Sequence, residues 1–274
     1  MGPAGGRQRP AKGRRAADAA LFLLVFFGGW QATALAVGAG YVVPGPLDVG
    51  ARALQLGTTA DFWRSVALSL ARIFAGFAIG MVAGVMLAVT MHGAPRLRTV
   101  LAPFVKILRT TPMVCFVLVL LLWASNTVIP TLVAALMVLP VFWTHAIEGL
   151  DAASAAYADV VRVFRISRMK AFWSIYLPSL SGELAAAAEV GMGLAWKSGV
   201  TAEVLALPPF AIGTGVYRAK LALEGPDLFV WTIAIVLLSL ALEAALRALT
   251  RRWRLARADE AAGEGDSDEA RSRR

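Results

Sequence analysis

The strongest constraint on the fold is a series of apolar runs that are long enough to cross a lipid bilayer as helices. A transmembrane helix needs about 20 predominantly apolar residues to span about 30 Å of hydrocarbon. Five runs approach or exceed this length, with polar or Pro/Gly-rich connections between them: Leu21–Val37, Val66–Val89, Val128–Ala146, Leu184–Leu207 and Leu228–Leu246. The pattern predicts an all-α integral membrane protein.

Composition agrees with a membrane protein and argues against other classes. Apolar residues make up 58% of the chain and charged residues 16%, outside the usual range of globular proteins. The net charge is +9, but the cations gather at helix ends and tails, which indicates membrane topology and not nucleic-acid binding. Cys115 is the single cysteine, so an intrachain disulfide is excluded. With His92 and His145 as the only histidines, no metal site and no cofactor are expected.

The chain divides into three predicted parts. They are a disordered basic tail over residues 1–18, a transmembrane domain over 19–257 and a disordered tail over 258–274. The first apolar run follows Arg14 and Arg15, an order that also fits a secretory signal peptide. Because further apolar runs follow, we predict an uncleaved first span.

One more span is predicted over Arg109–Ala124, although this segment is short. Lys106 and Arg109 interrupt its helix, and the purely apolar stretch begins only after Pro112. Snorkelling of the two cations to the cytoplasmic headgroups would make up the missing length. This segment brings the number of predicted transmembrane helices to six.

The second apolar run contains three glycines, Gly76, Gly80 and Gly84, at intervals of four residues. This spacing puts them on one face of a helix. Small residues on one face allow two helix backbones to approach closely. We therefore predict a helix-packing seam along this face.

The distribution of cations predicts that both termini lie in the cytoplasm. In that orientation the outer loops keep only Arg52, Arg218 and Lys220, with Arg64 at a border. The reverse orientation would place most cations on the translocated side, against the positive-inside rule.

The connection Asp159–Pro178, DVVRVFRISRMKAFWSIYLP, is a basic and amphipathic helix–turn–helix between the fourth and fifth predicted spans. Since it has no lipid to face, a cytosolic partner is expected to dock on it. Phe164 and Ile166 can supply an apolar face for burial. Flanking charges that fix the register come from Arg162, Arg165 and Arg168. The alternative is a basic loop that skims the membrane surface.

This connection resembles the EAA loop of permease subunits in ABC-type importers, where it forms the coupling helix that contacts the ATPase. The resemblance rests on Asp159, Phe164, Ser167, Arg168, Ile175, Leu177 and Pro178. Arg165 stands where that family usually has its turn glycine, and Asp159 stands for the usual Glu, with valines in place of a small alanine pair. Asp159 suits the positive end of a helix dipole. Leu177-Pro178 is expected to end the second amphipathic helix, because proline disfavours helical geometry in the residue before it.

The fifth run contains GMGLAWKSG (Gly191–Gly199), which is similar to a phosphate-binding loop. Trp196 takes the place of the glycine before Lys197, no strand precedes it, and it lies at membrane depth, so nucleotide binding is not expected. Lys197 must face protein or water, because a buried charge is costly in lipid. It can attract an anionic solute, with Trp196 and Ser198 beside it, or it can pair with Glu189 or Glu203. Both interpretations stay open.

From about Phe62 to Arg252 the chain resembles the permease subunit of a binding-protein-dependent ABC importer of the type I fold. The stretch AEVLALPPFAIGTGVYRAK is most similar to the nitrate/sulfonate/taurine branch. The resemblance implies a multi-pass protein of the inner membrane that transports a small, anionic solute as a homodimer. It also implies two cytosolic ATPase subunits and an extracytoplasmic binding protein, while the chain itself is not an enzyme. The alternative function is an ion-coupled secondary transporter or channel, although the inverted repeats common in such proteins are not visible here.

Overall fold

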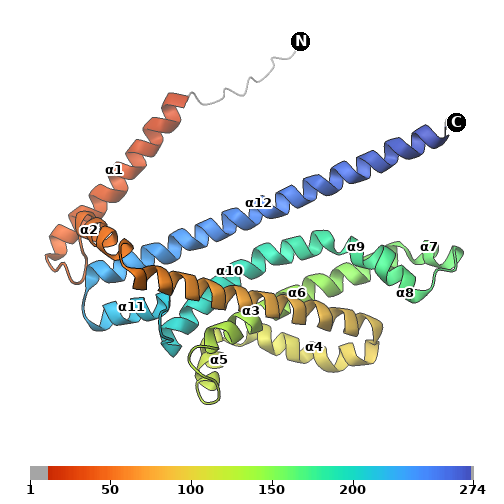
Figure 1. Cartoon of the computed structure of the whole chain (residues 1–274), viewed down its shortest axis with the longest axis horizontal. Helices are drawn as coiled ribbons and strands as arrows, with labels where there is room; N and C mark the ends of the chain where they lie inside the picture. The colour runs from red at the N-terminus through yellow and green to blue at the C-terminus, as the bar shows by residue number, and fades with distance from the viewer. Residues whose placement is uncertain (1–11, 273–274) are drawn as a thin grey trace, which may run out of the picture. The chain divides into compact units, whose positions relative to one another are not determined.

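The computed structural model describes residues 12–272, which are helical nearly throughout and contain no strand (Figure 1). For residues 12–16, 19, 168 and 253–272 it describes the backbone only. This confirms the predicted all-α class. Of the two tails predicted to be disordered, residues 1–11 and 273–274 lie outside the described residues, whereas 12–18 and 258–272 belong to α1 (Lys12–Val37) and α12 (Gly225–Ser272). The division into two tails and a membrane domain stays a prediction. The described residues form two compact units, one within 12–59 and 216–232 and the other within 60–215 and 233–272.

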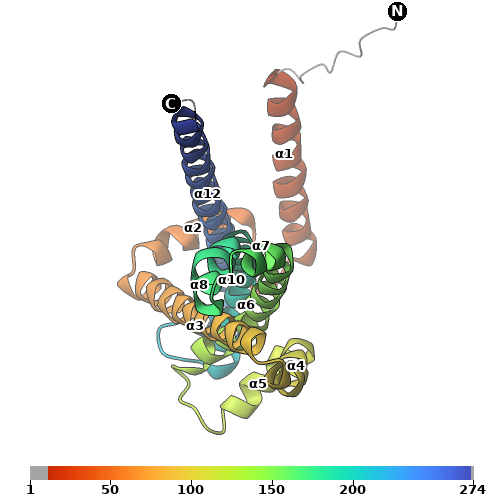
Figure 2. The same cartoon turned by 90° about the vertical axis from the view of Figure 1, so that its right-hand side faces the viewer.

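Three long helices pack side by side in the larger unit: α3 (Ala60–Gly93), α6 (Ile129–Ala156) and α10 (Ser181–Ala206) (Figures 1 and 2). Apolar side chains between them are almost fully buried, among them Ile73, Val138 and Phe142. The side chain of Ile73 lies against Gly199, where an added Cβ would come within 2.6 Å of Ile73 Cγ1. The absence of a side chain at Gly199 therefore lets Ile73 of α3 pack directly on α10.

The three evenly spaced glycines of α3 face α6. A Cβ built on Gly80 would lie 2.6 Å from the carbonyl oxygen of Ala135 and 2.8 Å from Val138 Cβ. A Cβ on Gly76 or Gly84 would lie 2.4 Å or 2.5 Å from a carbonyl oxygen of α6. Real side chains do not approach a backbone so closely, so only glycine permits this crossing of α3 over α6.

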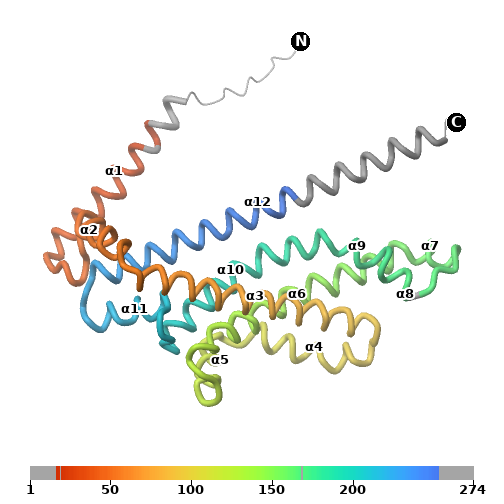
Figure 3. Tube along the Cα trace, in the orientation of Figure 1, coloured from red at the N-terminus to blue at the C-terminus, as the bar shows by residue number. Residues whose placement is uncertain are grey.

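A sharp bend interrupts the chain between α4 (Pro95–Thr110) and α5 (Met113–Leu120), whose axes differ by 98°. The predicted span over Arg109–Ala124 is therefore not one continuous helix. Thr111 is extended (φ −76°, ψ 129°) because it precedes Pro112, and a residue before proline avoids helical geometry. Figure 3 shows the Cα trace turning out of α4 into the short α5.

Four helices of the described part are long and apolar enough to cross a membrane, or five if the bent pair α4–α5 counts as one span. Their apolar segments are Ala20–Val37, Ala60–Gly93, Ile129–Ala156 and Gly225–Arg252, from α1 (Lys12–Val37), α3, α6 and α12 (Gly225–Ser272). With 26 residues, α10 is also long enough, but four charged side chains make it less apolar. The number of six spans stays a prediction.

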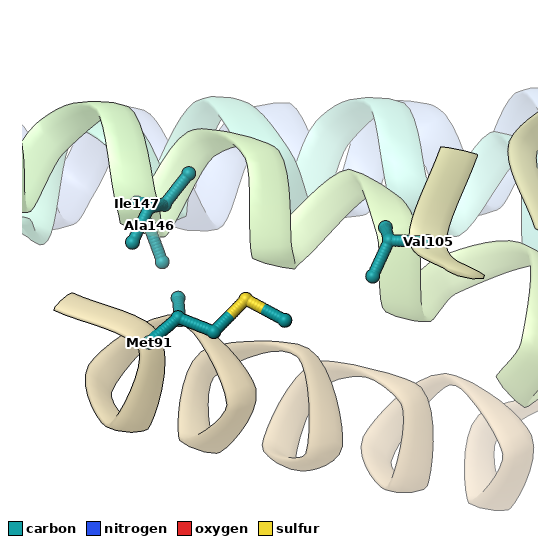
Figure 4. Close-up of a cluster of buried hydrophobic side chains, with 5 residues drawn as sticks. Met91, Val105, Ala146 and Ile147 are labelled. Carbon is teal, nitrogen blue, oxygen red and sulfur yellow. The ribbon is translucent and has the colours of Figure 1, made fainter. Parts of the chain in front are cut away.

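Near the ends of α3 and α6 a second cluster fixes α4 to the bundle. Its buried members are Ala88, Met91, Val105, Ala146 and Ile147 (Figure 4). Asp151 of α6 adds a polar clamp, because it contacts His92 Nδ1 at 3.0 Å and accepts a hydrogen bond from Arg98 at 2.7 Å. The turn between α3 and α4 is thus tied to α6 by both apolar and charged contacts.

The smaller unit joins α1, α2 (Pro46–Gly57) and the first turns of α12. The indole of Trp30 donates a hydrogen bond to the carbonyl of Pro44 at 2.9 Å and stacks on Phe229. Arg52 of α2 forms a two-pronged ion pair with Asp227. The hydrogen bond to Asp227 raises the pKa of Arg52, so Arg52 keeps its positive charge at physiological pH.

Candidate functional site

We define the connecting segment as residues 157–180, between α6 and α10. Its first helix, α7 (Ala158–Val163), ends in a Schellman motif. The amide of Ile166 donates to the carbonyl of Val161 at 3.0 Å, and the amide of Arg165 donates to that of Arg162 at 3.3 Å. Arg165 has φ 50°, in the left-handed region that glycine adopts without strain. The position where a turn glycine was expected therefore does require left-handed backbone.

Ser167 begins the second half of the connecting segment as the N-cap of α8 (Arg168–Ala171). Its Oγ accepts a hydrogen bond from the amide of Lys170 at 3.4 Å. A π-helix, η1 (Phe172–Tyr176), and the short α9 (Leu177–Ser179) follow. The prediction that Leu177-Pro178 ends the helix is wrong, because Leu177 is helical (φ −63°, ψ −44°). A π-turn has wider backbone spacing, which suits a proline that cannot donate an amide hydrogen.

Five exposed apolar side chains of the connecting segment form what we call the apolar face. They are Val160, Val163, Phe164, Met169 and Trp173. Phe164, which was predicted to take part, is 73% exposed, whereas Ile166 is only partly exposed. Sequence reasoning missed Met169 and Trp173, although their spacing of four residues places them on one helix face. Indole Nε1 of Trp173 donates to the Met169 sulfur at 3.2 Å.

Charged groups surround this apolar face. Asp159 and Arg162 form an exposed ion pair of 3.5 Å on α7. Arg165 is also exposed, while the side chain of Arg168 lies outside the described residues. A groove of about 510 Å³ runs between α7 and the η1–α9 stretch, and Tyr157, Ile175 and Pro178 line it. The segment thus offers an apolar centre, a charged border and a concave side.

Contacts at its end join the connecting segment to the helix bundle. The ring of Tyr176 in η1 meets that of His92 edge to face, with centroids 6.3 Å apart. His92 contacts Asp151, so η1 is connected to α3 and α6 together. Leu180 is buried against Gly149 of α6, where an added Cβ would lie 2.7 Å from Leu180 Cδ2. A displacement of the connecting segment would therefore act on the bundle directly.

The second predicted site consists of Trp196, Lys197 and Ser198 in α10, and the three side chains differ in exposure. Trp196 is 2% exposed, and its Nε1 has no hydrogen-bond partner among the described residues. Ser198 is also buried and donates to the carbonyl of Leu194 at 2.7 Å. Lys197 is exposed, and no ion pair to it occurs within the described side chains. Of the three, only Lys197 has an exposed side chain.

The two acids considered as partners of Lys197 have other partners. Glu189 accepts a hydrogen bond from Thr250 at 2.7 Å. Glu203 is fully buried and accepts hydrogen bonds from Ser69 Oγ at 2.8 Å and from the amide of Gly213 at 3.2 Å. Arg72 of α3 completes the cluster at 3.4 Å from Glu203.

This buried cluster also orders the loop that follows α10. The guanidinium of Arg72 donates to the carbonyls of Pro209 at 2.9 Å and Phe210 at 3.2 Å. Both Leu207 and Phe210 have left-handed backbones, with φ 53° and 47°. Arg64 lies over the Phe210 ring, 3.9 Å from its centroid. Pairs so distant in sequence leave no local signal, which is why sequence reasoning missed the cluster.

In the described residues no group of three or more His, Cys, Asp or Glu side chains could hold a metal ion. The candidate site consists of the exposed apolar face of the connecting segment and of polar groups inside the helix bundle.

The left-handed backbone of Arg165 leads to a prediction about the local stability of the turn after α7. A non-glycine residue in this conformation costs about 1 kcal/mol or more, and Arg165→Gly removes that cost. We expect slower amide hydrogen exchange at Ile166 and unchanged cooperativity of unfolding. Arg162→Gly, at a helical position in α7, is the matched control and should speed exchange, because glycine destabilises a helix interior by about 1 kcal/mol. Faster exchange in Arg165→Gly would contradict the assigned turn.

The chain is similar to known membrane components of transport systems. The profile of the family "Binding-protein-dependent transport system inner membrane component" matches residues 76–255. The taurine transport system permease protein TauC of Escherichia coli (strain K12) is 25% identical over 196 residues, 70% of each chain. The nitrate import permease protein NrtB of Synechocystis sp. (strain PCC 6803) is 27% identical over 188 residues, 64% of this chain and 67% of the relative.

The fold is similar to that of a solved transporter. In an inward-facing structure of the MetNI methionine ABC transporter, one chain superposes with a TM-score of 0.55 at 17% identity. The match covers 69% of this chain and 93% of that chain.

Proposed function

Because the chain belongs to the family of binding-protein-dependent transport system inner membrane components, we propose that it is the subunit that couples solute passage to a cytosolic ATPase. Membership of this family was predicted from sequence and is confirmed. It makes the chain a multi-pass permease of ABC importers and not an enzyme. The family also implies an ATPase and a substrate-binding protein as partners.

The apolar face of the connecting segment is the observation that carries the proposed coupling. Val163 and Phe164 are 74% and 73% exposed at the tip of a polar loop, where water would surround them in the isolated chain. Neighbouring exposed apolar side chains such as Val163 and Phe164, with charged residues beside them, are typical of protein-docking surfaces. An ATPase groove that buries Phe164 and pairs with Asp159 and Arg162 fits this surface.

The proposed orientation puts both termini and the connecting segment in the cytoplasm. It is supported by the excess of cations on that side of the predicted spans. ATP is available there, and the contact of Tyr176 with His92 gives a route from a docked ATPase into α3 and α6.

We infer a homodimer that alternates between inward- and outward-open states. ATP binding would close two ATPase subunits and draw the two connecting segments along, and hydrolysis would reset them. The solute that fits best is a small anion or a sulfonate-bearing molecule, because taurine and nitrate stand in the names of two relatives. The free cation of Lys197 supports an anionic solute.

The test uses two separate substitutions in the connecting segment. Each variant is reconstituted with the ATPase and the binding protein. Phe164→Ala removes an aromatic anchor, whose loss commonly costs about 2 kcal/mol or about 30-fold in affinity. Asp159→Lys reverses an exposed charge. Both variants should reach normal abundance, lose co-purifying ATPase and lose ATP hydrolysis stimulated by the binding protein.

Leu122→Ala is the matched control, since Leu122 is 80% exposed but lies between α5 and α6, outside the connecting segment. It should retain ATPase binding. Uptake that persists in Phe164→Ala and Asp159→Lys, and in cells without the ATPase, would overturn the proposal and favour an ion-coupled secondary transporter.

A further inference from the structure

A cavity of about 270 Å³ lies between α4, α6 and α10. Its walls come from Leu108 and Arg109 of α4, from four residues of α6 between 137 and 144 together with His145, and from Val190 and Leu194 of α10. These positions fall near the middle of the 28-residue α6 and of the 26-residue α10. The cavity therefore lies at mid-height of both long helices.

The α4 wall ends at the bend in the chain, and its Arg109, which the sequence analysis expected at the cytoplasmic headgroups, lines this cavity instead. Arg109 is the penultimate residue of α4, and the axis turns by 98° after it. Helices interrupted at the bilayer midplane commonly carry the solute sites of transporters, because the break exposes polar groups inside the membrane. An ionisable residue at such a depth is rarely retained without a partner or a function.

The lining has the composition of a small-solute site. Its walls are mainly apolar, and Arg109, Thr144 and His145 contribute the polar side chains. No carboxylate belongs to the lining, and Arg109 forms no ion pair among the side chains that the structure describes. Glu183 orients the ring of His145, because Glu183 Oε2 lies 3.1 Å from His145 Nδ1. The other ring nitrogen, Nε2, is then left to contact a ligand. A positive charge in an apolar wall without its own counter-ion favours an anion.

A second cation lies along the same face of α10. Lys197 follows Leu194 by three residues and Val190 by seven, spacings that place the three side chains on one side of the helix. It is exposed and lies about one turn beyond the cavity wall. An anionic solute could therefore meet Lys197 first and then bind at Arg109.

We propose that this cavity binds the anionic group of the transported solute and that Arg109 is its anchoring residue. The inference rests on the proposed transport function and specifies the class of solute. A guanidinium presents parallel N–H donors that match two oxygens of a nitrate, sulfonate or carboxylate. The volume of about 270 Å³ lies below the usual range for drug-sized ligands, which favours a small solute.

Direct binding tests the proposal without the binding protein, which would otherwise dominate the signal. The purified permease–ATPase complex is titrated by calorimetry with sodium nitrate, taurine and methanesulfonate, and with choline chloride as a cationic control. At least one of the first three should bind saturably and choline should not. Arg109→Gln should weaken that binding about tenfold or more, and Arg109→Lys should weaken it less.

Lys106→Gln is the matched control, because Lys106 is an exposed cation on the same helix but does not line the cavity. It should bind as the unaltered complex does. Equal binding by Arg109→Gln, or binding of none of the three probes, would overturn the anion site while leaving the ATPase-coupling proposal intact. Conversely, Arg109-dependent binding together with ATP-independent uptake would support the site and reject the coupling. Arg109→Lys preserves the charge and serves as the check that a loss is not misfolding.

Discussion

Gly80→Leu is expected to prevent α3 from packing on α6 and to abolish most of the folded permease. A single added Cβ would already lie 2.6 Å from the carbonyl oxygen of Ala135. Overpacking of a tight contact costs about 1–3 kcal/mol and sometimes more, and here the obstacle is backbone, which cannot rotate away. Gly80→Ala should therefore lower the melting temperature in detergent, and Gly80→Leu should give little monodisperse protein.

Gly193→Ala provides the matched control for this seam. Gly193 lies within α10, and a Cβ there would meet no atom within 4 Å. Its melting temperature should stay close to that of the unaltered protein, since alanine is also the better helix former. Equal stability of Gly80→Ala and Gly193→Ala would show that α3 and α6 do not cross at these glycines.

Glu203→Gln is expected to have a comparably large effect on stability. Ser69, Arg72 and the amide of Gly213 all present donors to the carboxylate, so the new amide nitrogen would face donors only. Removal of one member of a buried ion pair costs about 3–5 kcal/mol, because the other charge stays buried without compensation. Arg72 is only 13% exposed but would keep its hydrogen bonds to the carbonyls of Pro209 and Phe210, so we expect a loss near the lower end of this range. The measurement is thermal unfolding, with limited proteolysis of residues 207–213 as a local readout.

Two further variants test whether the loss of stability comes from breaking the Arg72–Glu203 ion pair or from the loss of any acidic side chain in α10. Glu183→Gln alters an acid of α10 that is 50% exposed, and its melting temperature should change little. The double variant Arg72→Leu with Glu203→Leu removes both charges and should recover part of the lost stability. If the double variant were no more stable than Glu203→Gln, the ion pair would not be the reason for the loss.

The number and identity of the long helices followed from local properties of the chain. Apolar runs of sufficient length predicted the helices that became α3, α6, α10 and the first part of α12, because helical hydrogen bonds close within the segment and lipid selects for apolar side chains. The regular spacing of Gly76, Gly80 and Gly84 predicted a seam, since helical periodicity is also a local property. The connecting segment was predicted from its residues in the same way.

Which groups meet across the bundle was decided only by the tertiary structure. The spacing of the glycines did not identify α6 as the partner of α3. Glu203 was considered as a partner of Lys197 nearby, but it pairs with Arg72, 131 residues away. The crossing of α3 and α10 makes that choice, since a buried carboxylate pairs with whatever donors the packing brings to it.

At the bend after Arg109, the local sequence explains where α4 ends, and the tertiary packing explains the direction that the chain then takes. The sequence determined that the helix stops near Pro112, because proline restricts the residue before it. The direction of α5, and the resulting cavity of Arg109 with His145, depend on packing against α6 and α10. The sequence by itself thus determined the helices and their breaks, whereas the tertiary structure decided which charges are paired and which are left free to bind a ligand, because those contacts join residues far apart in the chain.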